Sequence, residues 1–298
     1  MPGNDRLDGL VAVHPLARRH HLAAAVQAFS QIFHGAGHCR LCLQARERGS
    51  RELLRAGIVR GRFAIGDKPF AGRALTAQFM PSRPDMVRAV AAEGKAEGRV
   101  SGTNSWVINE LQMGDTMVAD GYGKIIEGTL IGSNLGSGIA AHTHSGFIFD
   151  AGIRDAEENR EIANLNGFYR GYDPSAWAQM NLTGIDIPVR IGRAIVLPGD
   201  LVLAKHDGVI FIPAVLAAQA IAKAEFTNLQ DAFNFDLNKQ GANGAEFEGG
   251  WTAQKFDALE KWVNAHPEKL KMTKAEFSEL LTQAKAPRPA GGRGRGGQ

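Results

Sequence analysis

Four segments decide the fold of this 298-residue chain: TMVAD (Thr116–Asp120), LGSGIAAHTH (Leu135–His144), GFIFD (Gly146–Asp150) and DAEENREIAN (Asp155–Asn164). The first and third are short apolar runs bounded by turn residues, which predicts buried strands. The second and fourth have the length and composition of helices. Strands and helices therefore alternate here, and such alternation is typical of a layered α/β domain.

The pattern changes in the second half of the chain. Short apolar runs separated by Gly- and Pro-containing turns predict an antiparallel meander. Proline is accommodated in the first turn of a helix, so Pro213 is expected to open a long helix through about Asp231. A capping box at Thr273 and Glu276 predicts the start of a later helix. The expected strands cover 187–191, 194–197, 201–204 and 209–212, and another helix is expected near 252–264.

Composition divides the chain into four parts. Residues 1–62 carry ten Arg, no Lys and four acidic residues, which predicts an atypical segment that is either disordered or not part of the native protein. A catalytic domain is expected over 63–235 and a helical extension over 236–285. Residues 286–298 are rich in Gly and Arg and are expected to be disordered. The two cysteines, Cys39 and Cys42, are either incidental thiols or a redox or zinc half-site.

Charge and hydropathy narrow the functional class. No apolar run approaches the roughly 20 residues that a membrane span requires, so no membrane partner is expected and a cytoplasmic location is predicted. Beyond residue 62 the chain holds 24 basic and 27 acidic residues, and nucleic acid is therefore not an expected partner.

Two stretches carry the candidate chemistry: Gly132-Ser133-Asn134-Leu135-Gly136 and Gly152-Ile153-Arg154-Asp155-Ala156-Glu157-Glu158. The first is a small-residue turn whose backbone N–H groups suit an anion. The second places a fixed cation beside a carboxylate, which suits a site for a metal and an acidic substrate together. The structural alternative is that Asp155 is a helix N-cap with Glu158 as its reciprocal acid, and that Gly132 and Gly136 only form a turn.

The order of features from residue 71 to 213 resembles the RraA-like family. That family includes regulators of ribonuclease E and class II 4-hydroxy-4-methyl-2-oxoglutarate aldolases. The resemblance implies a mixed sheet or β-sandwich flanked by helices, a homotrimer or hexamer, and sites between subunits. It is carried by AGRALT (71–76), GDTMV (114–118), GSNL (132–135), GIRD (152–155), IPV (187–189) and PGD (198–200).

The resemblance also implies roles for particular residues. Asp155 matches the metal-ligating Asp, Arg154 the substrate-binding Arg, and Glu158 a trailing acid that reaches the metal directly or through water. The implied cofactor is Mg²⁺ or Mn²⁺, and an acid from a neighbouring subunit falls on Glu225. Ser133 stands where the aldolases have an Asp. Substrate is expected to contact Arg154 and the turn Gly132, Ser133, Asn134 and Leu135.

These matches imply a divalent-metal-dependent lyase that forms pyruvate from a small 2-oxo acid through an enolate. Aldol cleavage needs a base for the substrate hydroxyl, and serine is a poor base, so decarboxylation of oxaloacetate is expected to be the better reaction. The alternative is a regulator without catalysis that binds an RNA-degrading enzyme. A methyltransferase is disfavoured, because the acid downstream of the glycine-rich turn is tied to Arg154 rather than placed to bind a ribose.

Overall fold

The computed structural model describes residues 63–66, 68–205, 208–241 and 250–286. The expectations for residues 1–62, with Cys39 and Cys42, and for the tail from 287 onward lie outside the described residues. Within the described ranges, no helix is long and apolar enough to cross a membrane.

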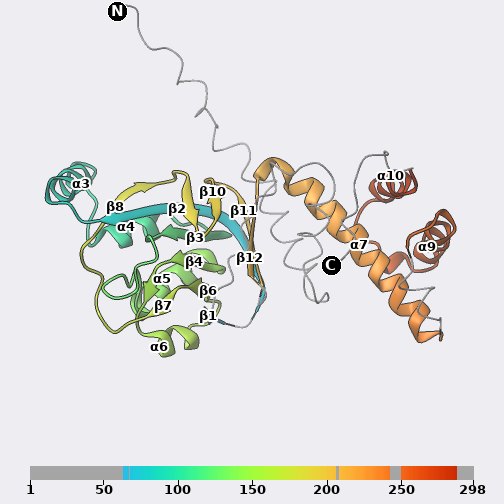
Figure 1. Cartoon of the computed structure of the whole chain (residues 1–298), viewed down its shortest axis with the longest axis horizontal. Coiled ribbons are helices and arrows are strands. Elements are labelled where there is room, and N and C mark those ends of the chain that lie inside the picture. The colour runs from blue at the N-terminus through green and yellow to red at the C-terminus, as the bar shows by residue number, and fades with distance from the viewer. Residues whose placement is uncertain (1–62, 67, 206–207, 242–249, 287–298) are drawn as a thin grey trace, which may run out of the picture.

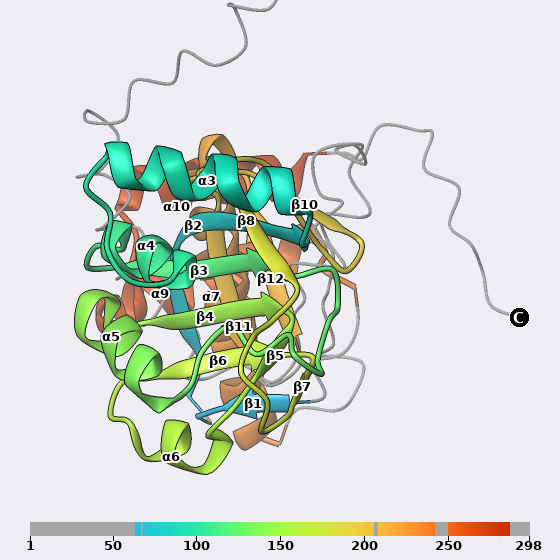
Figure 2. The same ribbon diagram turned by 90° about the vertical axis from the view of Figure 1, so that its left-hand side faces the viewer.

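One curled mixed sheet forms the body of the protein, with strands in the order β1-β6-β4-β3-β2-β11-β12 and with β8 paired to the far end of β2 (Figure 1). Strands β2, β3, β4 and β6 run parallel, and Figure 2 shows β3, β4 and β6 side by side. The strands are β1 (Phe63–Ile65), β2 (Phe70–Pro81), β3 (Asp115–Asp120), β4 (Gly146–Asp150), β5 (Gly152–Ile153), β6 (Asn166–Tyr169), β7 (Gly171–Tyr172), β8 (Met180–Ile185), β9 (Val189–Ile191), β10 (Ala194–Val196), β11 (Leu201–Lys205) and β12 (Gly208–Ile212).

Helices cover one face of this sheet and a hairpin covers the other. Because side chains alternate along a strand, Met117 and Ala119 of β3 pack into a core with α4 and α5, whereas Val118 packs under β9 and β10. The helices are α3 (Pro84–Ala96), α4 (Thr103–Glu110), α5 (Ser133–Thr143), α6 (Ala156–Glu161), α7 (Ala217–Lys239), α9 (Ala253–Ala265) and α10 (Lys274–Lys285), with short 3₁₀ turns at Ala214–Leu216 and Pro267–Lys269.

The expected α/β fold with a C-terminal helical extension is confirmed, and the expected meander is wrong in one respect. Strands β9 and β10 form a separate two-stranded sheet, whereas β11 joins the main sheet beside β2. The turn between them explains the separation. Gly199 has φ of +83°, its N–H donates to the carbonyl of Ala74, and the carbonyl of Asp200 accepts from the N–H of Ala74. The turn is thus bound to β2 and directs the chain into a different sheet.

Two expected helices also differ from the structure. The helix expected over 155–164 is the shorter α6, because the backbone at Ile162 is extended. The sequence also predicts a helix over 84–98 with Met86, Val87, Val90 and Ala91 on one face. In α3 these residues are at most half-buried, and Gly94 is the residue of that helix that is buried. Gly94 lies against the indole of Trp106, since a Cβ there would come within 2.1 Å of the ring.

Helix α7 connects the sheet to a separate hydrophobic core. Its first turns pack on β11 and β12. Farther along, α7, α9 and α10 bury a second core of mostly aromatic and branched side chains, here named the C-terminal helical unit, which lies at the opposite end of the molecule from α5 and α6 (Figure 1). Its buried residues are Phe226, Leu229, Phe233, Phe256, Leu259, Val263, Phe277 and Leu281.

Candidate functional site

The chain leaving β4 brings the two candidate stretches together. Strand β5 ends at Ile153, and the N–H of Arg154 then donates to the carbonyl of Ile131 at 2.9 Å. A bridge between Thr129 and Gly152 pairs the same two segments one step earlier. The loop before α5 therefore runs beside the segment before α6, and residues about twenty positions apart in sequence become neighbours.

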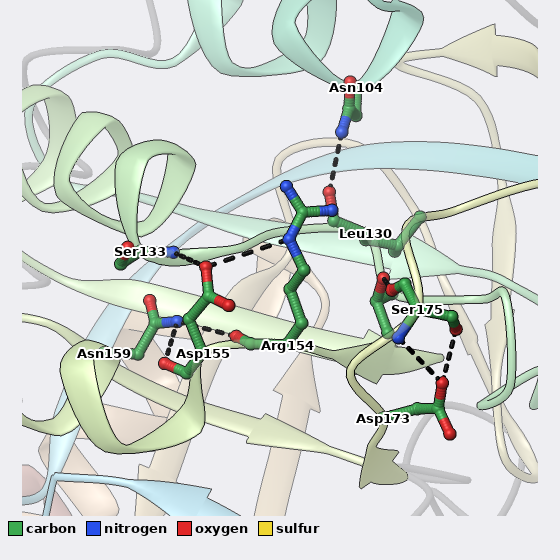
Figure 3. Close-up of polar contacts among 9 residues, drawn as sticks. Asn104, Leu130, Ser133, Arg154, Asp155, Asn159, Asp173 and Ser175 are labelled. Atoms are coloured by element: carbon green, nitrogen blue, oxygen red, sulfur yellow. Dashed lines mark hydrogen bonds and ion pairs between the residues drawn. The ribbon is translucent and has the colours of Figure 1, made fainter.

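Asp155 occupies the N-cap position of α6 but does not cap that helix. Its side chain makes no hydrogen bond to α6; instead Oδ2 accepts from the N–H of Ser133, the first residue of α5, at 3.0 Å (Figure 3). The guanidinium of Arg154 lies on the same oxygen, with Nε 3.8 Å away. The alternative in which Asp155 and Glu158 cap α6 is therefore wrong, because the carboxylate of Asp155 accepts a hydrogen bond from the N-terminus of α5 instead.

Gly132 is required by this arrangement. A Cβ at Gly132 would come within 2.4 Å of Oδ2 of Asp155 and 2.9 Å of Nε of Arg154. Its φ is −113°, so the glycine is needed for the close approach rather than for a left-handed turn. We refer to Gly132, Ser133, Arg154, Asp155 and Asn159 as the α5–α6 corner.

Asn159 belongs to this corner and was not among the candidates from sequence. Its side chain is fully buried, and Nδ2 donates to the carbonyls of Arg154 at 3.0 Å and Asp155 at 2.8 Å. The signal in the sequence was weak: a small amide four residues after Asp155 resembles any polar residue on a short helix. Only the packing of α6 against α5 shows that it points inward.

The two charged side chains are open to a ligand. Arg154 is 36% exposed and Asp155 is 38% exposed, although their backbones are held by β5 and by Asn159. Among the described residues, Oδ1 of Asp155 receives no hydrogen bond. A fixed cation and a carboxylate with one free oxygen thus face solvent at the N-terminus of α5, where the helix dipole also favours negative charge.

The donor set fits a hydrated divalent ion. Mg²⁺ commonly binds proteins through one or two carboxylates and keeps several waters. Asp155 supplies one such carboxylate, and the described residues contain no cluster of three or more His, Cys, Asp or Glu side chains able to hold a metal. An ion here would therefore be held mainly by Asp155 and water.

The remaining candidates lie in three different settings. The N–H of Ser133 already donates to Asp155, so at the start of α5 the N–H groups of Asn134 and Leu135 are left for a substrate. Glu158 is exposed on the first turn of α6. Glu225 is buried in α7 beside Lys271 and Glu276. Figure 1 shows α7 running from the sheet toward α9 and α10, away from α5 and α6.

A second polar cluster lies on the other side of Arg154 (Figure 3). The N–H of Asp173 donates to the carbonyl of Ile153, which places Asp173 beside the strand that leads to Arg154. Ser175 donates to Asp173 from both its N–H and its hydroxyl, and the carbonyl of Ser175 accepts from Thr129 Oγ1 at 2.6 Å. These bonds fix the loop that faces the corner.

Other acidic residues of the turn motifs serve the fold. Asp115 is buried in an ion pair with Arg73, and burial raises the pKa of its carboxyl although the arginine opposes the shift. Asp200 accepts the N–H of Leu197 at 2.9 Å, and burial raises its pKa as well. Both side chains close turns ahead of strands.

Curated proteins similar to this chain are named as aldolases. This chain is 30% identical over 138 residues to a protein of Halalkalibacterium halodurans named "Putative 4-hydroxy-4-methyl-2-oxoglutarate aldolase". The aligned region covers 44% of this chain and 63% of that protein. It is 28% identical over 107 residues to the 4-hydroxy-4-methyl-2-oxoglutarate aldolase of Thermus thermophilus, over 36% of this chain and 64% of that protein. The chain thus spans less than two thirds of the length of either relative.

A solved structure shares the fold. RraAS2 of Streptomyces coelicolor, described as an unusual member of the RNase ES inhibitor RraA protein family, superposes with a TM-score of 0.56 at 25% identity, over 70% of this chain and 94% of that one. The family described as RraA-like: Aldolase/RraA matches residues 44–211. That range includes both stretches of the α5–α6 corner and begins before the compositional boundary at Phe63. Since the match covers more than half of the sequence, this chain belongs to the RraA-like (Aldolase/RraA) family.

Proposed function

We propose that the protein is a divalent-metal-dependent lyase that releases pyruvate from a small 2-oxo acid. The observation that carries the proposal is the α5–α6 corner, where a half-exposed guanidinium and a half-exposed carboxylate are held together by backbone hydrogen bonds. The names of the aldolase relatives agree with this chemistry. Mg²⁺ or Mn²⁺ bound at Asp155 would stabilise the negative charge of the enolate as a Lewis acid.

The protein's own residues supply binding and orientation. The planar, permanently charged guanidinium of Arg154 suits the carboxylate or the developing enolate oxygen of a 2-oxo acid. The free N–H groups at the start of α5 suit the substrate carboxylate. We propose that the loop fixed by Ser175, which lies on the other side of Arg154, meets the far end of the substrate.

Two reactions fit, and Ser133 separates them. In aldol cleavage the bond between C3 and C4 breaks, the C4 hydroxyl loses its proton, and the electron pair remains on C3 as an enolate. In decarboxylation of oxaloacetate the same electron pair is left when CO₂ departs, and no hydroxyl proton is removed. Losing a general base typically costs ~10²–10⁴ in rate. We therefore propose that decarboxylation is the faster reaction.

A second candidate function is regulatory. An inhibitor of an RNA-degrading enzyme needs no base, so Ser133 in place of an acid is compatible with it, and the Streptomyces relative belongs to a family of such inhibitors. Against it stands the pairing of Arg154 with Asp155, which binding alone does not require.

Assembly and location complete the proposal. We propose a homotrimer or hexamer in the cytoplasm, in line with the family resemblance. Glu225 is 9% exposed in the single chain, and we leave it out of the proposed site. Light scattering of the purified chain would measure the assembly.

The deciding experiment measures pyruvate release from oxaloacetate and from 4-hydroxy-4-methyl-2-oxoglutarate, with Mg²⁺ or Mn²⁺ and after chelation. We expect metal-dependent turnover of oxaloacetate and much slower cleavage of the aldol substrate. Comparable turnover of both substrates would contradict the role given to Ser133. Turnover that survives chelation would contradict the metal.

A further inference from the structure

The backbone of Asp155 lies in a conformation that is uncommon for residues other than glycine, although Asp and Asn tolerate it better than most. Its φ and ψ are 53° and 47°, in the left-handed region where a Cβ is crowded by the backbone. Such conformations persist where surrounding contacts impose them, and they gather at functional sites. This backbone turn is also what directs the carboxylate away from α6 and toward Ser133 of α5.

Asn159 provides the contacts that impose the turn. Its amide nitrogen spans the peptide carbonyls on both sides of the Asp155 Cα, those of Arg154 and Asp155, and its own N–H donates to the carbonyl of Asp155 at 2.9 Å. The orientation of the amide is fixed by chemistry, since the reversed orientation would set an oxygen against two carbonyl oxygens.

Asn159 also fixes α6 to the helix that supplies the partner of Asp155. A Cβ at Gly136 of α5 would come within 2.0 Å of Oδ1 of Asn159, so the glycine lets the amide pack directly against α5. The same helix contributes the N–H of Ser133. One buried side chain therefore determines both the direction of the carboxylate and the distance to its donor.

Burying the amide of Asn159 costs free energy, so the stability of the fold alone does not explain why an asparagine is present here. Oδ1 of Asn159 is buried and meets no hydrogen-bond donor among the residues that the structure describes. A buried acceptor without a donor destabilises the folded state, and an apolar side chain of similar volume would avoid the penalty. A precise orientation of the Arg154–Asp155 pair is what the amide supplies in return.

We propose that Asn159 is a positioning residue that holds the carboxylate of Asp155 and the guanidinium of Arg154 in one fixed geometry. For catalysis, the inference rests on the proposed function, because the orientation affects a reaction only if Asp155 binds the ion. The structural role of Asn159 does not depend on the proposed function, because the hydrogen bond between Ser133 and Asp155 is measurable without any substrate.

The test is amide hydrogen exchange of the full-length protein, read at Ser133. Its N–H has Asp155 as its partner, so its protection factor reports the position of the carboxylate. In Asn159→Ala we expect that protection to fall about ten-fold, the effect of losing one hydrogen bond. The amide of Ile139, inside α5, should keep its protection, because the helix itself remains formed.

Two further variants separate positioning from general destabilisation. Asn159→Ser keeps a hydroxyl donor toward the carbonyl four residues earlier, that of Asp155, and should retain part of the Ser133 protection. Asn181→Ala is the matched control: Asn181 lies on β8 and is buried, and its Nδ2 likewise has no hydrogen-bond partner within the described part of the chain. It should lower the overall stability without a selective effect on Ser133.

A selective loss of protection at Ser133 in Asn159→Ala, with partial recovery in Asn159→Ser, supports the proposal. Unchanged protection, or an equal loss in Asn181→Ala, overturns it. If the wild type turns over oxaloacetate, the Mn²⁺ concentration for half-maximal rate should rise about ten-fold in Asn159→Ala and stay constant in Asn181→Ala. A wild type without turnover overturns the proposed function, and the exchange measurement still decides the role of Asn159.

Discussion

Asp155 of the α5–α6 corner and Glu225 of the C-terminal helical unit each lie near a cationic side chain, but the two carboxylates are in opposite environments. Asp155 is 38% exposed and is held by a backbone N–H, with Arg154 at 3.8 Å. Glu225 is 9% exposed, and burial raises its pKa despite the nearby charge of Lys271. The difference is that the first carboxylate is oriented by backbone and left open, while the second is enclosed by helices.

Solvent exposure of an oriented carboxylate is what distinguishes a ligand-binding site from a carboxylate buried by helix packing. A carboxylate that is oriented yet exposed stays solvated and can take a ligand at little cost in free energy. A carboxylate enclosed by apolar helices loses solvation, and each further contact must first offset that loss. The presence of a cation nearby does not distinguish the two environments.

The largest expected effect comes from removing the exposed carboxylate. Asp155→Ala should lower metal-dependent turnover by more than about 100-fold, because even outer partners of metal ligands cost 10–100-fold when they are removed. Asp85→Asn is the control, since Asp85 is exposed at the start of α3 and pairs with Arg83. Steady-state rates over a Mn²⁺ titration check the prediction. Equal rates for the two variants would show that Asp155 is not part of the site.

The next effect comes from filling the space beside that carboxylate. Gly132→Ala should reduce turnover by roughly 10–100-fold, since the added Cβ displaces Asp155 and Arg154, and a shift of about 1 Å is enough for such losses. Gly250→Ala is the matched control, because a Cβ there meets no atom of the described residues within 4 Å. The comparison of kcat between the two variants decides. An active Gly132→Ala variant would mean that the corner tolerates rearrangement.

In the C-terminal helical unit the expected effect is on stability and depends on pH. Because burial raises the pKa of Glu225 above its ordinary value of 4.5, the folded state binds its proton more tightly than the unfolded state. Proton binding by Glu225 therefore stabilises the folded state. The stabilisation is fully present when the pH is below the ordinary pKa, and it is lost as the pH rises through the raised pKa of the folded state. Each ten-fold difference in proton affinity corresponds to about 1.4 kcal/mol.

Glu225→Gln should therefore be more stable than wild type at pH 7 and equally stable near pH 4. Urea denaturation at the two pH values measures the difference, and Glu268→Gln, at an exposed glutamate, is the control. A variant that is less stable than wild type at pH 7 would show that attraction to Lys271 outweighs the cost of burial, and the contrast with Asp155 would be lost.

The smallest expected effect concerns the cap of the last helix. Thr273 accepts the N–H of Glu276, and the Glu276 carboxylate accepts the N–H of Thr273 in return. Thr273→Ala should lower the free energy of unfolding by about 1 kcal/mol. Turnover should stay unchanged, because α10 belongs to the C-terminal helical unit. A parallel loss of activity would show that this unit supports the α5–α6 corner.

Local sequence determined a large part of the protein. Short apolar runs bounded by turn residues located β3 and β4, and the capping box at Thr273 and Glu276 located the start of α10. The spacing of the turn before α5 and of the Arg154-Asp155 pair identified both halves of the α5–α6 corner. These features depend on side chains only a few residues apart, so their signal survives in one sequence.

Tertiary structure alone decided the remaining features. The chain path between Ile131 and Arg154 made Asp155 the partner of α5 rather than the cap of α6, and the approach of Gly136 turned Asn159 inward. The packing of α7 against α10 enclosed Glu225, and the contacts of Gly199 and Asp200 with Ala74 separated the two hairpins. Each depends on groups distant in sequence, and no local propensity reports which of them meet.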